Sequence, residues 1–171
     1  MFIKPQHGFA MVEVLVTMII MALGTLGISA MLLQAHKANS SSYLKQQALQ
    51  VVYNMLDKMK ANRQAVVDGR YNFSNLTAGT PVVPAMSTNC ANAPCTASQL
   101  ASYDIVSWLN QDVSLLPAGS AAINAVNNSG LMTVTITVQW NDSPAQTKLG
   151  AIGTVSPLNA NLVQYSLETL I

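Results

Sequence analysis

Glu13 is the first residue whose chemistry is unusual, because it is the only charged residue in the 25-residue stretch from Phe9 to Leu33. A carboxylate at the centre of a membrane helix costs about 2.5–3.5 kcal/mol, so it usually has a partner of opposite charge. The simpler interpretation is that Glu13 lies one turn from the helix start, where the interface and the positive end of the helix dipole stabilise it. Position alone leaves both interpretations open.

Gly8 and Phe9 form the junction between a short polar beginning and this apolar stretch. A secretory signal peptide has its apolar region before the cleavage point, so cleavage removes that region. A cut between Gly8 and Phe9 would instead leave the apolar region on the mature protein. The alternative is an ordinary signal peptide cut after Ala30, but the length of the apolar stretch and the charge of Glu13 count against it.

Cys90 and Cys95 lie five positions apart in a segment rich in Asn, Ala, Pro and Thr. Two cysteines alone cannot complete a four-ligand zinc site, and the only histidines are His7 and His36. The apolar N-terminal region indicates export to a compartment in which disulfides persist. We therefore expect a bond between Cys90 and Cys95, with a pair of free thiols as the alternative.

No pattern in the sequence predicts an enzyme or a nucleic-acid-binding protein. Once the first eight residues are removed, His36 is the sole histidine, and no Ser or Cys has a base at a recognisable spacing. Lys and Arg total 8 and Asp and Glu total 7, so the chain lacks a basic surface for nucleic acid. We expect no catalytic residue, cofactor, metal or nucleic-acid partner. Trp108 and Trp140 are expected in the core, and Asp104 and Asp112 in solvent or at helix caps.

The apolar stretch 9–33 is long enough to cross a membrane as a helix, and helical spacing continues beyond it. One apolar stripe steps by three or four residues through Leu44, Ala48, Val51, Met55 and Met59. Asn62 interrupts the stripe, Val66 resumes it, and Asp68-Gly69 ends the helix with a residue suited to the left-handed cap. The pattern predicts one helix of nearly 60 residues.

A second helix is expected after a loop over 69–95, because Thr96 and Gln99 have the spacing of a capping box. Pro117 and Gly119 are expected to close this helix. Its predicted apolar stripe consists of Leu100, Tyr103, Val106, Leu109, Val113 and Leu116.

The last third of the chain predicts strands. Residues 132–140 alternate strictly between apolar and polar side chains, which is typical of a strand with one buried face. A turn over 127–130 makes 121–126 its expected hairpin partner, and 163–171 suggests a last strand. Helices followed by strands predict an α+β fold, with a long N-terminal helix packed on a small antiparallel sheet.

The residues between Gly8 and Glu13 resemble the cleavage and methylation signal of the type IV pilin family. The resemblance implies that a prepilin peptidase cuts after Gly8 and N-methylates Phe9. It also implies that Glu13 pairs with the N-terminal amine of a neighbouring subunit. Two such charges are costly in a dry filament core unless they form an ion pair, so this pairing would set the stagger between subunits. The expected division is a leader (1–8), a membrane and filament-core helix (9–33) and a periplasmic pilin domain (34–171).

The stretch from Ala48 to Arg63, together with the order of Cys90, Cys95, Trp108 and later residues, is similar to the PilV minor pilins. That resemblance implies a non-enzymatic subunit, anchored once in the inner membrane, that helps prime pilus assembly and then sits at the pilus tip on the cell surface. Its implied partners are other minor pilins, the major pilin, prepilin peptidase and a tip adhesin. A minor pseudopilin of type II secretion is the alternative, and a periplasmic protein released by signal peptidase is a weaker one.

Overall fold

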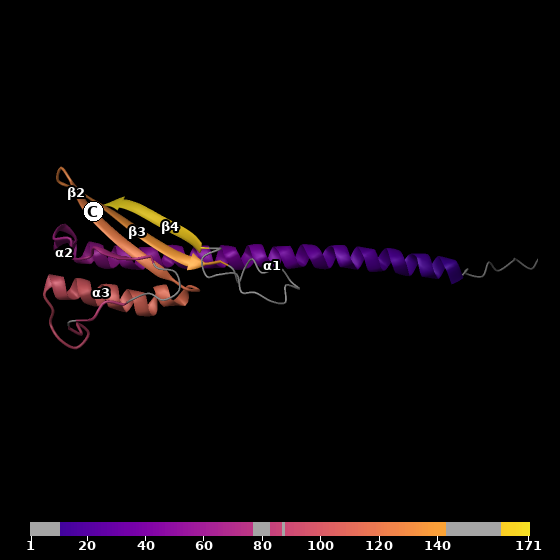
Figure 1. The fold of residues 1–171 in the computed structure, drawn as a ribbon, viewed down its shortest axis with the longest axis horizontal. Helices are drawn as coiled ribbons and strands as arrows, with labels where there is room; N and C mark the ends of the chain where they lie inside the picture. Colours follow the sequence, from indigo (N-terminus) through magenta and orange to yellow (C-terminus); the bar gives the residue numbers. More distant parts are fainter. Residues whose placement is uncertain (1–10, 77–82, 87, 143–161) are drawn as a thin grey trace, which may run out of the picture. The chain divides into compact units, whose positions relative to one another are not determined.

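The computed structural model describes residues 11–76, 83–86, 88–142 and 162–171, and its chain divides into two compact units, 1–39 and 40–171. Its helices are α1 (Met11–Ala61), α2 (Arg63–Val67), α3 (Ala97–Gln111) and the short 3-10 helix η1 (Val113–Leu115). Its strands are β1 (Phe73–Asn75), β2 (Ser120–Asn128), β3 (Leu131–Asn141) and β4 (Leu162–Leu170). The strands form one antiparallel sheet in the order β1-β2-β3-β4 (Figure 1). A long N-terminal helix with a small antiparallel sheet confirms the predicted α+β class.

In the first unit, the described residues 11–39 all belong to α1. Their hydroxyl groups are bonded within the helix: Thr17 donates to the carbonyl of Val14 at 2.8 Å, and Ser29 donates to that of Thr25 at 2.8 Å. Such bonds satisfy side chains that find no water in an apolar environment.

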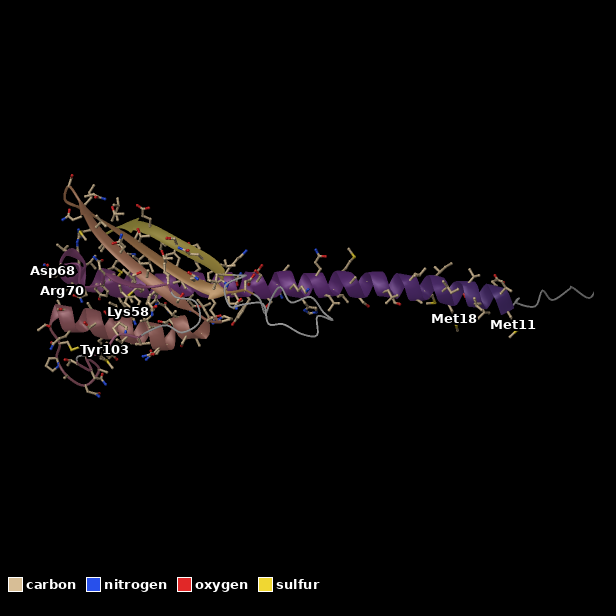
Figure 2. All side chains as sticks on the ribbon, in the orientation of Figure 1. Met11, Met18, Lys58, Asp68, Arg70 and Tyr103 are labelled. Atoms are coloured by element: carbon tan, nitrogen blue, oxygen red, sulfur yellow. A yellow bond between two sulfur atoms is a disulfide. The ribbon has the colours of Figure 1, made fainter. Side chains whose placement is uncertain are left out.

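In the second unit, the remaining turns of α1 bury the predicted apolar stripe. Every stripe member is at most 9% exposed, and Val52 and Leu56 widen the buried face. Trp108 joins α3 to this helix, since its indole N–H donates to the carbonyl of Val51 at 2.8 Å. Lys58 adds a second link between α1 and α3 by donating to the hydroxyl of Ser107 at 3.2 Å (Figure 2).

The helix predicted to run for nearly 60 residues is instead broken at Asn62, where α1 ends and α2 begins. Asn62 adopts φ −119° and ψ 52°, outside the helical region. Its side chain donates to the carbonyl of Ala97 at 2.8 Å, so a contact with the start of α3 holds the break. Gly69 then takes φ +68°, and the N–H of Arg70 donates to the carbonyl of Ala65 at 2.8 Å, which makes the predicted left-handed cap a Schellman motif.

Helix α3 begins with the predicted capping box. The N–H of Gln99 donates to the hydroxyl of Thr96 at 3.3 Å, and the N–H of Thr96 donates to the side-chain oxygen of Gln99 at 2.9 Å. Two predictions for this helix are wrong. The α-helix ends at Gln111 and continues as η1, and Leu100 and Tyr103 are only half-buried. The buried face includes Ala101, Ile105 and Trp108 instead.

The sheet follows the sequence closely except at its short edge. Strands β2 and β3 form the expected hairpin, and Trp140 and Val138 of β3 lie in the core, as does Trp108 of α3. Strand β1 lies in a segment that was expected to be a loop. Asn72 places it there, because its side chain accepts from the N–H of Ala125 at 2.7 Å and donates to the carbonyl of the same residue at 3.3 Å.

Candidate functional site

Glu13 lies in the first described turn of α1 and is exposed, as are all described side chains up to His36. Among the described residues it forms no ion pair. The same segment of α1 exposes large apolar side chains: Met11 is 91% exposed and Met18 is 68% exposed (Figure 2). Glu13 is thus the single carboxylate on a largely apolar stretch of helix surface.

Within the described residues, α1 is the one helix whose length and composition would allow it to cross a membrane. None of its apolar window is buried, which distinguishes it from the core helix of a soluble domain. The exposed large apolar side chains of this segment are Met11, Val12, Val14, Leu15, Val16, Met18, Ile19, Ile20, Met21, Leu23, Leu26, Ile28, Met31, Leu32 and Leu33. A surface of this kind marks contact with lipid or with other apolar helices. Gly8 and Phe9, the predicted cleavage and methylation residues, lie outside the described residues.

Cys90 and Cys95 form the expected disulfide, with their Cα atoms 5.6 Å apart. Both side chains are half-buried, and Cys95 directly precedes Thr96, which caps α3. Gln99 ties the same loop to the helix by donating to the hydroxyl of Thr88 at 3.3 Å. The bridge therefore holds the loop that leads into α3.

The sequence did not reveal a buried polar cluster of Asn62, Tyr71 and Asp104. The Tyr71 hydroxyl donates to Asp104 Oδ2 at 2.6 Å and accepts from the Asn62 amide at 3.3 Å. Asp104 was expected in solvent or at a cap, but it is only 8% exposed. Burial raises the pKa of Tyr71, its bond to Asp104 raises that pKa further, and the bond from Asn62 acts in the opposite direction. The three residues come from the helix break, the loop before β1 and α3, so no local pattern could have predicted their contact.

In the part of the chain that the structure describes, no group of three or more His, Cys, Asp or Glu side chains could hold a metal ion. In the buried cluster, the Tyr71 hydroxyl bonds to both Asp104 and Asn62, so it joins the other two residues. These contacts join the helix break, the loop before β1 and α3 within the second unit.

Two family models match the chain. Residues 3–29 match the prokaryotic N-terminal methylation motif, and residues 30–106 match type IV pilin Tt1218. The first match covers Gly8, Phe9 and Glu13, and the second runs from the end of the apolar stretch into α3. No curated protein and no solved structure matches the chain significantly.

Proposed function

From these two matches, which support a type IV pilin-like or pseudopilin-type protein, we propose that the chain is a PilV-like minor pilin. It helps prime pilus assembly together with other minor pilins and then sits with them in a complex at the tip. The observation that carries the proposal is the overlap of the methylation motif with an exposed apolar helix that bears one carboxylate, Glu13.

Processing comes first in this function. Prepilin peptidase removes residues 1–8, and the amine of Phe9 becomes the methylated N-terminus. The apolar part of α1 anchors the mature protein once in the inner membrane, and the second unit lies in the periplasm. An oxidising compartment suits the Cys90–Cys95 disulfide.

Assembly then proceeds by helix packing. Apolar helices associate side by side, and the carboxylate of Glu13 pairs with the amine of Phe9 on a neighbour. Either charge buried alone in a filament core would be costly, so the pair forms only at one stagger of the two helices. The same logic requires no catalytic group, because pilins are structural proteins.

The second unit selects the neighbours. The surface of the second unit distinguishes this chain from the major pilin. The major pilin is a further partner, and a tip adhesin can bind to the same unit. The similarity to minor pilins over Ala48 to Arg63 supports this role, since most of that stretch forms the last turns of α1, whose buried side chains share the core with the sheet. A minor pseudopilin of type II secretion has the same signal and the same helix, and the genes beside this one would distinguish the two.

The N-terminus of the mature protein tests the proposal directly. The full chain should be produced in cells that have prepilin peptidase, purified from the inner membrane and sequenced from its N-terminus. Methylated Phe9 is the expected first residue. A mature chain that begins at Met31 would show that signal peptidase removes the apolar stretch, and the proposal would then be wrong.

A further inference from the structure

A groove of about 330 Å³ lies between the second half of α1 and the edge strand β4. It is lined by Lys45, Gln46, Leu49, Trp140, Val163, Gln164 and Tyr165. Apolar side chains form most of this lining, although Leu49 is 37% exposed and Val163 and Tyr165 are only half-buried. The groove thus leaves apolar surface incompletely covered at the rim of the core.

The backbone of β4 is open along the same side. Strand β4 ends the sheet order, so among the described residues it pairs only with β3 (Figure 1). The N–H of Ile171 donates to the carbonyl of Met132, and antiparallel pairing makes inward and outward groups alternate from there. The N–H groups of Gln164 and Ser166 therefore point away from β3 and can bond to an added strand.

One polar feature of the groove indicates what could fill it. Lys45 is the one charged residue of the lining, and it has no acidic partner among the described residues. A suitable occupant brings carbonyl oxygens and apolar side chains, and it has no positive charge near Lys45.

Resting on the proposed function, we propose that β4 is a strand-addition site for a neighbouring pilin-like subunit. An extended, neutral or acidic segment of that subunit pairs with the outward N–H and C=O groups of Gln164 and Ser166. Its alternate apolar side chains enter the groove over Leu49 and Trp140. Main-chain bonds supply affinity in this mode of binding, and the pocket beside the edge supplies specificity.

The opposite end of β4 restricts the site to the groove. Glu168 projects from the strand on the face shared with its partner Thr135 and is exposed. A charge near the end of an edge strand discourages indiscriminate pairing with other strands. The uncharged half of β4, residues 162–166, is the half that borders the groove.

A photo-crosslinking experiment on the full chain in its native membrane tests this site. The photoreactive residue p-benzoylphenylalanine is placed at Gln46 in the groove or, as a control, at Asn124, which is exposed on β2. The Gln46 probe should give a crosslinked product and the Asn124 probe should not. Mass spectrometry should locate the link in an extended segment of a different protein that has a processed, methylated N-terminus.

A matched pair of variants then distinguishes the contribution of the Gln164 backbone N–H from that of its side chain. Gln164→Pro removes the outward N–H but no bond to β3, and proline is tolerated at such edge positions. Gln164→Ala keeps that N–H. The crosslinking yield should fall about tenfold with proline, the effect of losing roughly one good hydrogen bond, and should stay within about twofold with alanine.

Control measurements keep the test decisive. Both variants should match the unaltered chain in membrane level and in oxidation of the Cys90–Cys95 bridge. If Gln164→Pro lowers the level, Leu49→Glu takes its place, because it puts a negative charge into the groove without altering the edge. A neutral or acidic segment with apolar side chains should then bind less, and the crosslinking yield should fall by a similar factor. Equal yields from both variants, a product no stronger than the Asn124 control, or a link to a second copy of this chain would overturn the proposal. A mature N-terminus other than Phe9 would instead overturn the proposed function.

Discussion

Removal of the Tyr71 hydroxyl is the sharpest test of how the second unit is held together. Tyr71→Phe keeps the ring, which is completely buried, and deletes the donor that lies 2.6 Å from Asp104 Oδ2. Asp104 is only 8% exposed, so water replaces the lost bond poorly. A hydrogen bond to a charged group contributes about 1.5–3 kcal/mol, and a buried group left unsatisfied costs about 1–3 kcal/mol.

We therefore expect Tyr71→Phe to lower the free energy of unfolding by about 2–4 kcal/mol. Asp104→Leu alone should also destabilise, because it leaves the buried hydroxyl with the Asn62 amide as its one remaining partner. Tyr71→Phe combined with Asp104→Leu should recover part of the loss, since replacing both partners by apolar groups is often close to neutral.

The assay is urea unfolding of the full chain in detergent, followed by the fluorescence of the buried Trp108 and Trp140. Far-ultraviolet circular dichroism of the folded variants serves as the control for intact helices. A Tyr71→Phe change below about 0.5 kcal/mol, the usual size of a surface substitution, would refute the view that this bond is structural.

The same cluster gives a pH prediction. Burial and the bond to Asp104 raise the pKa of Tyr71 above its usual value. The unfolded chain therefore loses this proton first as the pH rises, so the stability from Tyr71 is complete below about pH 10 and falls above it. Tyr71→Phe should remove this alkaline decrease, and an unchanged pH profile would contradict the cause given for the raised pKa.

Three further predictions concern assembly, processing and the bridge. Glu13→Leu should insert and accumulate in the membrane, yet its share in sheared pili should fall more than about a hundredfold. The reason is that breaking a buried ion pair costs about 3–5 kcal/mol. An unchanged ratio of sheared to membrane protein would mean that Glu13 does not set the stagger with Phe9. Gly8→Asp should block maturation and leave a band about 0.9 kDa larger on a gel, as expected for a retained eight-residue leader, and normal maturation would rule out this cut site. Labelling of the unreduced chain should find no free thiol at Cys90 or Cys95, and replacing both by Ser should cost less than about 3 kcal/mol in unfolding, since the closed loop is short.

The sequence by itself determined several features that depend on local spacing or chemistry. The stripe from Leu44 to Met59 became the buried face of α1, because residues three or four apart share one side of a helix. Thr96 and Gln99 formed their capping box, and Gly69 took the left-handed cap. The strict alternation over 132–140 likewise gave β3, whose core-facing side chains include Val134 and Trp140.

The roles predicted for Gly8, Phe9 and Glu13 rest on the resemblance of a short local stretch of sequence to a cleavage and methylation signal. The match to the methylation motif over residues 3–29 supports the family to which that signal points. The specific roles of the three residues remain predictions, and the experiments above test them.

Tertiary structure alone decided the features that join distant parts of the chain. Strand β1 is three residues long, and it is a strand only because it pairs with β2. Asp104 is buried because Tyr71, 33 residues away, supplies a donor. The groove beside β4 likewise needs α1 and the end of the chain together. Such contacts depend on which elements pack, and helical or strand periodicity describes only which face of each element is apolar.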